Sequence, residues 1–272
     1  MLQEVRLLCA GYSRVDWSIF KMGNPTGTLV RAPAWMYLLR STDGLMLVDT
    51  GMPKACIDNA HYFDEPGQPL MIVPEMGPDD WVERVLARQG LEVQDIDAVI
   101  STHWHFDHAG GIHLFRHQPI YVHPLEMAAG RTGAYPPECS DPTLNYRPIG
   151  DGYQPTPGVT LLHTPGHTPG HLSVYLEPAA GRPILLTIDA VYTLDNWQSD
   201  VPGEQADPET GRRSVARLKE VALAGDAAVF FGHDPEQEHE SFWRTQMGQY
   251  GAATGVDASG CLRCRPPAAP YV

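Results

Sequence analysis

Residues 101–111 read Ser-Thr-His-Trp-His-Phe-Asp-His-Ala-Gly-Gly and follow a short apolar run that predicts a buried strand. His103 and His105 point the same way in an extended chain, because side chains alternate with a period of two. The glycines after the motif allow the chain to turn, which would present Asp107 and His108 towards a neighbouring point. Four potential ligands within six residues therefore predict a site for two adjacent metal ions.

Further candidate ligands stand where other predicted strands end. His167 lies in the loop Thr-Pro-Gly-His-Thr-Pro-Gly-His, Asp189 ends the run Ile-Leu-Leu-Thr-Ile-Asp, and His233 follows Val-Phe-Phe-Gly. Strand ends can converge on one edge of a sheet, where α/β proteins place their sites. Imidazole and carboxylate ligands without thiolate favour Zn²⁺, with iron, cobalt and manganese as alternatives. His171, after a glycine at a strand start, either contacts a metal or orients a neighbour.

Strand and helix patterns alternate along the chain without a linker-like break, which predicts a single α/β domain over residues 1–257. The expected strands are 35–40, 45–49, 98–102, 159–163, 171–177, 183–188 and 227–231, and the expected helices run from Asp79 or Asp80 to about Gln89 and from Asp207 to Gly225. Residues 53–78 are expected to form a long surface loop. The Pro-rich tail 258–272, which carries Cys261 and Cys264, is expected to be poorly ordered.

Composition excludes several classes of protein. Hydrophobic residues make up 43% of the 272 residues and charged residues 19%, a globular balance. The net charge of −14 and the lack of a basic cluster argue against a nucleic-acid partner. No run approaches the ~20 apolar residues of a membrane span. Five scattered cysteines make a poor disulfide framework and, with an N-terminus unlike a secretory signal, predict the cytoplasm.

The motif His-x-His-x-Asp-His, the later Thr-Pro-Gly-His, and the Asp and His at strand ends resemble the metallo-β-lactamase superfamily over about residues 35–240. The resemblance implies an αββα sandwich with two metal ions in one site. One ion would be held by His103, His105 and His167, and the other by Asp107, His108 and His233, with Asp189 bridging the two.

Within the superfamily, the stretches LVDTGMP, HTPGHTPGH, LLTIDAVYT and FFGHDPEQ are similar to the N-acyl-homoserine lactone lactonases, which are quorum-quenching enzymes. The resemblance implies a small lactone substrate whose carbonyl, contacted by Tyr192, is attacked by a water activated between the two ions. Asp107 would pass a proton to the leaving alkoxide. Phe106, Phe63 and Met22 are expected to line the acyl pocket, and a homodimer is left open.

Four other functions are compatible with these motifs. Another lactone such as 4-pyridoxolactone is chemically close, and a thioester hydrolase of the glyoxalase II type shares the ligand motif. A persulfide dioxygenase would hold one iron per chain, and a non-catalytic module would bind metal without hydrolysing any ester. Metal content and a hydrolysis assay separate these alternatives.

Overall fold

Strand β2 (Leu29–Ser41) is buried on both faces, and its alternating side chains contribute to two separate cores. Trp35 and Tyr37 point into the core between the two sheets, whereas Met36 and Leu38 point into the core beneath the outer helices. A strand buried on both sides must be covered by a layer on each side. The computed structural model describes residues 1–62, 71–130, 135–247 and 262–264.

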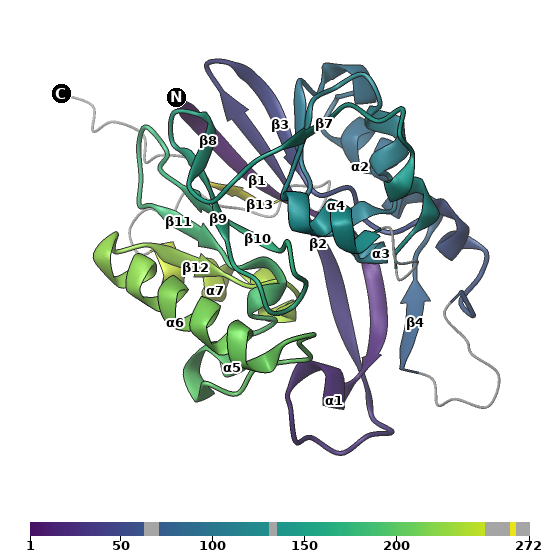
Figure 1. The fold of residues 1–272 in the computed structure, drawn as a ribbon, viewed down its shortest axis with the longest axis vertical. Coiled ribbons are helices and arrows are strands. Elements are labelled where there is room, and N and C mark those ends of the chain that lie inside the picture. Colours follow the sequence, from purple (N-terminus) through teal and green to yellow (C-terminus); the bar gives the residue numbers. More distant parts are fainter. Residues whose placement is uncertain (63–70, 131–134, 248–261, 265–272) are drawn as a thin grey trace.

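Two sheets face each other across the first of these cores (Figure 1). The larger sheet has the order β13-β1-β2-β3-β5-β6-β7, with β4 paired to β1, and its strands are β1 (Leu2–Asp16), β2, β3 (Gly44–Val48), β4 (Ile72–Glu75), β5 (Ala98–Ile100), β6 (Ile120–Val122), β7 (Tyr146–Pro148) and β13 (Leu262–Cys264). The smaller sheet has the order β12-β11-β10-β9-β8, formed by β8 (Tyr153–Thr156), β9 (Val159–His163), β10 (Leu172–Leu176), β11 (Ile184–Leu186) and β12 (Ala228–Phe230).

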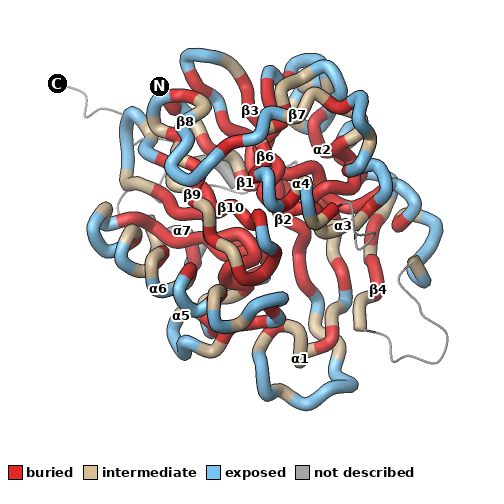
Figure 2. Tube along the Cα trace, in the orientation of Figure 1, coloured by how far each residue is buried: buried red, intermediate tan, exposed pale blue. Residues whose placement is uncertain are grey.

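Helices cover the outer face of each sheet. The larger sheet is flanked by α2 (Val82–Arg88), α3 (Phe106–Ala109) and α4 (Pro124–Gly130), and the smaller by α5 (Leu194–Ser199), α6 (Pro208–Ala224) and α7 (Glu240–Met247), while α1 (Trp17–Phe20) follows β1 (Figure 1). The predicted αββα sandwich is therefore confirmed. Burial is concentrated in the strands of both sheets, and the exposed segments are mainly loops and outer helix faces (Figure 2). No described helix is long and apolar enough to cross a membrane.

Several predicted elements are confirmed. The β2–β3 hairpin closes with Ser41 opposite Gly44. The Asp207 carboxylate caps α6 by accepting from two backbone N–H groups of its first turn, at 3.1 Å each, and Gly225 ends this helix. The buried face of α6 includes Leu218 and Ala222, as the 3.6-residue period predicts.

The structure differs from the sequence predictions in four places. The 15-residue strand β1 was not predicted, because charged residues interrupt its alternation and a register shift breaks it between Cys9 and Tyr12. Residues 72–75 of the expected loop 53–78 form β4, paired with β1. Asp80 does not cap α2; its carboxylate accepts from Gly77 N at 2.8 Å and closes a short 3-10 turn before that helix. In the tail, β13 pairs with β1, and the rest lies outside the described residues.

Candidate metal centre

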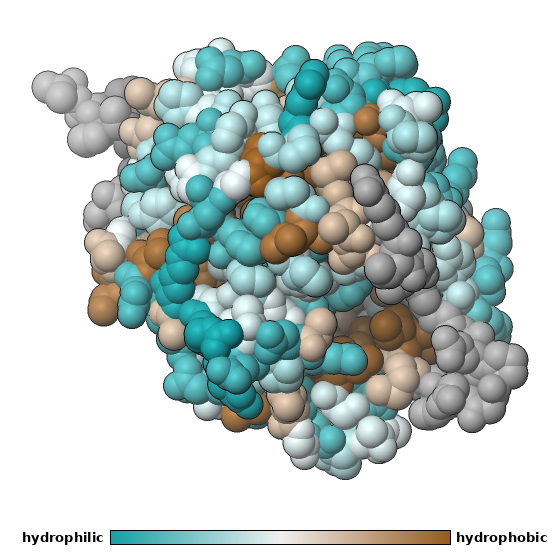
Figure 3. Space-filling view, in the orientation of Figure 1, coloured by the Kyte–Doolittle hydropathy of each residue, from teal (hydrophilic) through white to brown (hydrophobic). Residues whose placement is uncertain are grey.

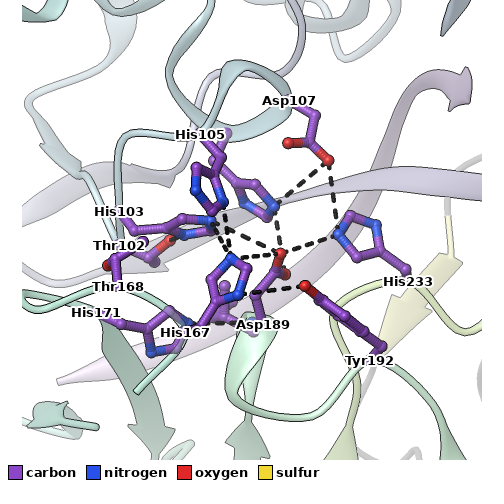
Figure 4. A network of polar contacts seen from close by, with 12 residues as sticks. Thr102, His103, His105, Asp107, His167, Thr168, His171, Asp189, Tyr192 and His233 are labelled. Atoms are coloured by element: carbon purple, nitrogen blue, oxygen red, sulfur yellow. Dashed lines mark hydrogen bonds and ion pairs between the residues drawn. The ribbon is translucent and has the colours of Figure 1, made fainter. Parts of the chain in front are cut away.

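The ends of neighbouring parallel strands bring the candidate ligands to one place. Strands β3 and β5 run parallel, as do β11 and β12 in the facing sheet, so their carboxyl ends meet at one edge of the sandwich. His103 follows β5, Asp189 follows β11, and His233 follows β12, whereas His167 lies in the loop between β9 and β10. Figure 4 shows the side chains of the four residues converging.

The seven predicted ligands form two groups. The first ligand group is His103, His105, His167 and Asp189, and the second is Asp107, His108 and His233; within each group one ligand atom per residue lies within 4.8 Å of the others. In the first group, Nε2 of His167 lies 3.2 Å from Nε2 of His103 and 2.8 Å from Nδ1 of His105. In the second, Oδ2 of Asp107 lies 3.5 Å from Nε2 of His233.

Asp189 lies between the two groups. Its Oδ2 is 3.3 Å from Nε2 of His167 and 3.1 Å from Nε2 of His233, and its Oδ1 is 3.3 Å from Nε2 of His108. One carboxylate therefore faces ligands of both groups. The residue before it, Ile188, has a φ of 50°, a left-handed conformation that costs a β-branched residue strain, and it occurs where the chain turns to aim Asp189.

The outer nitrogens of four histidines face oxygen atoms, which fixes where their protons lie. Nδ1 of His233 donates to the Pro33 carbonyl at 2.9 Å, and Nδ1 of His108 donates to Asp49 Oδ2 at 2.9 Å. Likewise Nδ1 of His103 faces the Thr102 hydroxyl at 3.1 Å and Nδ1 of His167 faces the Glu204 carbonyl at 3.3 Å. A neutral imidazole with its proton on Nδ1 presents the Nε2 lone pair, so in their neutral form all four rings direct that lone pair into the centre.

This arrangement fits divalent cations. Among the described residues, the buried atoms Nε2 of His108 and Oδ1 of Asp189 have no hydrogen-bond partner, which is costly unless a cation lies between the groups. Burial would raise the pKa of Asp189, but His233 and His108 outweigh it and hold that pKa well below its usual range. Burial lowers the pKa of His108 and His233, but the Asp189 carboxylate outweighs it and raises both, so without a cation protonated imidazole balances the charge of Asp189, and a bound cation would take over that role. Burial and the neighbouring His108 lower the pKa of His103, which keeps this ligand neutral.

His171 belongs to neither group. It is fully buried, and its Nε2 accepts a hydrogen bond of 3.1 Å from the backbone N–H of Asp189. Of the two roles considered for it, the structure therefore gives it that of orienting a neighbour. The other histidines, His61, His113, His117, His123, His163 and His239, belong to neither group of described residues.

A cavity of about 330 Å³ opens onto the two groups, with His105, Asp107, His167, Asp189 and His233 in its lining. Its other walls are mainly apolar and come from Val15, Ile19, Phe20, Ala32, Pro33, Ala34, Ile72 and Phe106. Figure 3 shows hydrophobic surface gathered in a hollow on this face of the molecule. The cavity thus joins a polar centre to an apolar chamber.

Tyr192 lies at the boundary between these two parts of the cavity. Its hydroxyl is 3.2 Å from Nδ1 of His167 and 3.3 Å from the Glu204 carbonyl. Burial and the nearby charge of Asp189 raise its pKa well above the usual range, so the hydroxyl keeps its proton and can donate. Its ring contacts Phe20, with ring centroids 5.6 Å apart.

One predicted pocket residue does not line the cavity, and the position of another is not described. Met22 is 43% exposed and does not line it; Phe20, two residues earlier, does. Phe63 lies outside the described residues.

Sequence reasoning missed Asp49, whose carboxylate accepts from His108 and from both the backbone N–H and the hydroxyl of Thr102, at 2.8 and 2.7 Å. It ends a buried strand beside β5, the same signal that identified Asp189.

Comparisons with known proteins agree with this geometry. Residues 30–233 match the model of the metallo-beta-lactamase superfamily. An N-acyl homoserine lactonase from a Bacillus species is 44% identical over 87% of this chain and 95% of its own length, and the lactonase AttM of Rhizobium radiobacter is 30% identical over 87% and 92%. The structure of N-acyl homoserine lactone hydrolase with its product N-hexanoyl-L-homoserine at the catalytic metal centre is 40% identical and superposes with a TM-score of 0.84, covering 88% of this chain and 96% of that one. The chain therefore belongs to the metallo-beta-lactamase superfamily and, within it, to the N-acyl homoserine lactonase family.

Proposed function

We infer that this protein is a metal-dependent hydrolase that opens the lactone ring of N-acyl homoserine lactones. The main evidence for this function is the arrangement of the site. Two ligand groups share Asp189, and a cavity with apolar walls opens onto both of them. Relatives that are 41–44% identical over most of the chain are N-acyl homoserine lactonases. One related structure holds a ring-opened product at its metal centre.

The proposed ligands of one divalent cation are His103, His105 and His167, and those of the other are Asp107, His108 and His233, with Asp189 shared. Zinc is the proposed metal, because imidazole and carboxylate ligands suit it. Ions bound there would supply a nucleophile at neutral pH by lowering the pKa of a water, and would polarise the lactone carbonyl.

The protein's own groups would orient the lactone and handle protons. The Tyr192 hydroxyl, protonated and at the edge of the cavity, is placed to donate to the lactone carbonyl oxygen as negative charge develops on it. Ring opening leaves an alkoxide that needs a proton. The Asp107 carboxylate lines the cavity beside His233 and is the proposed carrier of that proton, which it would take from the attacking water and pass to the alkoxide.

The apolar walls are the proposed site of the acyl chain. Phe20 and Phe106 face the same cavity as the ligands, so the acyl chain, which is attached through an amide nitrogen to the lactone ring, could pack there and exclude water. A compact bicyclic lactone such as 4-pyridoxolactone would leave these apolar walls uncovered, which favours the acylated substrate.

An assay of acid release tests this function. The purified protein is given homoserine lactones of several acyl lengths, with 4-pyridoxolactone and a glutathione thioester as alternatives, and its metal content is measured in parallel. We expect hydrolysis of the acylated lactones and about two metal ions per chain. Hydrolysis of only one of the alternatives would reassign the substrate, and a single iron per chain without lactone hydrolysis would favour the dioxygenase.

The location and assembly of the protein are separate proposals. Cys9, Cys56 and Cys139 are free thiols in the described part of the chain, which supports the cytoplasm as the compartment. All seven proposed ligands come from one chain, so the site needs no second copy, and the homodimer stays a prediction.

A further inference from the structure

Glu126, on α4, has a fully buried side chain that reaches two loops from different sheets. Its Oε1 accepts from the backbone N–H of Trp104 at 2.9 Å. Its Oε2 accepts from the backbone N–H of Gly170 at 3.0 Å and from the hydroxyl of Thr168 at 2.6 Å. A buried carboxylate with three donors is well compensated, so these contacts hold both loops firmly.

The residues that Glu126 holds are neighbours of the first ligand group. Trp104 stands between His103 and His105 in the loop after β5, and Thr168 directly follows His167 in the loop between β9 and β10. The first loop belongs to the larger sheet and the second to the smaller, so the three imidazoles meet only if the two loops keep their relative position. No hydrogen bond described for the Glu126 carboxylate goes to Asp107, His108 or His233.

Two glycines let α4 approach these loops closely. A Cβ atom at Gly170 would lie 2.2 Å from the Glu126 backbone nitrogen and 2.5 Å from its Cβ, and one at Gly130 would lie 2.2 Å from the Trp104 ring. Gly170 is not among the residues with positive φ, so space rather than backbone conformation requires a glycine there. The helix is thus fitted against both loops by steric contact as well as by hydrogen bonds.

We propose that Glu126 is a positioning residue that joins the two loops of the first ligand group and thereby sets the affinity of the ion held by His103, His105 and His167. This role rests on the metal site of the proposed function. It predicts an effect on one ion of the pair, because the second ligand group is held from elsewhere, by Asp49 and by the Pro33 carbonyl.

Glu126→Gln tests this role with almost no change in volume. An amide has one oxygen, so either the Trp104 N–H or the Gly170 N–H would face an NH₂ group instead of an acceptor. Loss of outer partners of metal ligands typically lowers metal affinity by about 10–100-fold. We expect a decrease of that size for the first ion and little change for the second.

Asp16 provides a matched control. It is 1% exposed and, like Glu126, accepts from one hydroxyl and two backbone N–H groups, namely Ser18 Oγ at 2.6 Å, Ser18 N at 3.0 Å and Gly27 N at 2.6 Å. The residues that donate to Asp16 are not adjacent in the sequence to any proposed metal ligand. Asp16→Asn therefore removes the same kind of buried contact and should leave both ions bound.

The experiment measures metal retention in the full-length chain. Wild type, Glu126→Gln and Asp16→Asn are loaded with Co²⁺ and titrated with a competing chelator, while the visible absorption of the bound ions and the metal content are recorded. We expect Glu126→Gln to lose one equivalent at a chelator concentration at which wild type and Asp16→Asn keep two. Gly170→Ala displaces Glu126 without removing its charge and should lose the same single equivalent of metal. If Glu126→Gln does not fold, the result for Gly170→Ala tests the role of Glu126 in its place.

Equal retention of both ions by a folded Glu126→Gln and by Gly170→Ala would overturn the role of Glu126 alone. The same loss in Asp16→Asn would overturn it too, because the effect would then be general destabilisation. A wild-type chain that binds no ion would instead overturn the proposed function on which this role rests.

Discussion

The backbone N–H of Asp189 donates a hydrogen bond of 3.1 Å to Nε2 of His171. Because Nε2 accepts, the proton of the neutral ring lies on Nδ1 and is donated to the Thr164 hydroxyl at 2.9 Å. That hydroxyl donates to Ser173 Oγ at 2.9 Å, and Ser173 donates to the Thr187 carbonyl at 2.9 Å. A buried chain of hydrogen bonds thus fixes the backbone on both sides of Ile188 and aims the shared carboxylate.

His171→Leu should therefore destabilise the protein and weaken metal binding. It leaves the Asp189 N–H buried without a partner, which costs about 1–3 kcal/mol, and it leaves the Thr164 hydroxyl with Ser173 as its remaining partner. Chemical unfolding measures the loss, with His171→Gln as the comparison, since its amide oxygen can still accept. Equal unfolding free energies for wild type and His171→Leu would show that the chain of hydrogen bonds contributes nothing.

Tyr192→Phe should retain both ions and turn over more slowly. Nδ1 of His167 keeps the Glu204 carbonyl as its acceptor, so metal binding does not depend on the tyrosine hydroxyl. Removing one donor to a developing oxyanion typically lowers kcat by about 10²–10³-fold. Steady-state kinetics and metal analysis check this together; an unchanged kcat on the true substrate would remove Tyr192 from the reaction.

Asp107→Asn should lower both metal content and turnover. The amide carries no charge to bind the second ion beside His108 and His233. Even groups that only hydrogen-bond to a metal ligand contribute about 10–100-fold to metal affinity, so we expect the loss of a direct ligand to be at least as large. Elemental analysis after dialysis measures the ions. Glu220→Gln, on the exposed face of α6, is the control. Full activity with two retained ions would refute the role of Asp107.

Phe20→Ala should weaken selection for long acyl chains. Phe20 is 4% exposed and walls the cavity, and loss of a large apolar contact of this kind lowers kcat/KM by about 10–200-fold. We expect the decrease for a decanoyl substrate and little change for a butanoyl one. Met22→Ala, at an exposed position outside the cavity, should match wild type with both substrates. A uniform decrease across chain lengths would argue against acyl contact at Phe20.

His123 should make the unfolding free energy depend on pH between about 4 and 6.5. Burial and the neighbouring His163, whose ring stacks on it at 3.8 Å, lower the pKa of His123 from 6.5 to about 4. In this window the unfolded chain binds more protons at His123 than the folded chain does, so its contribution is complete above pH 6.5 and is lost as the pH falls towards 4. Denaturant unfolding across this range should show a shallower decline for His123→Gln than for wild type, and parallel curves would contradict the assignment.

The sequence alone predicted the fold class, which is confirmed, and the candidate ligands, which the structure brings together in two groups. Five histidines and two aspartates stand at the ends of apolar runs or in the loop between two of them, and parallel strands in a sandwich deliver their ends to a common edge. The residue types then limit which metals can bind. These inferences hold because local alternation and strand ends are properties of neighbouring residues.

Only the tertiary structure decided how those ligands are supported. Asp49 is 59 residues from His108 along the chain, and Glu126 is 44 residues from Gly170, yet each pair shares a hydrogen bond. In the sequence, Glu126 looks like any carboxylate on a short helix. Whether such a group faces solvent or two ligand loops depends on how the sheets and helices pack, and packing joins residues that no local pattern relates.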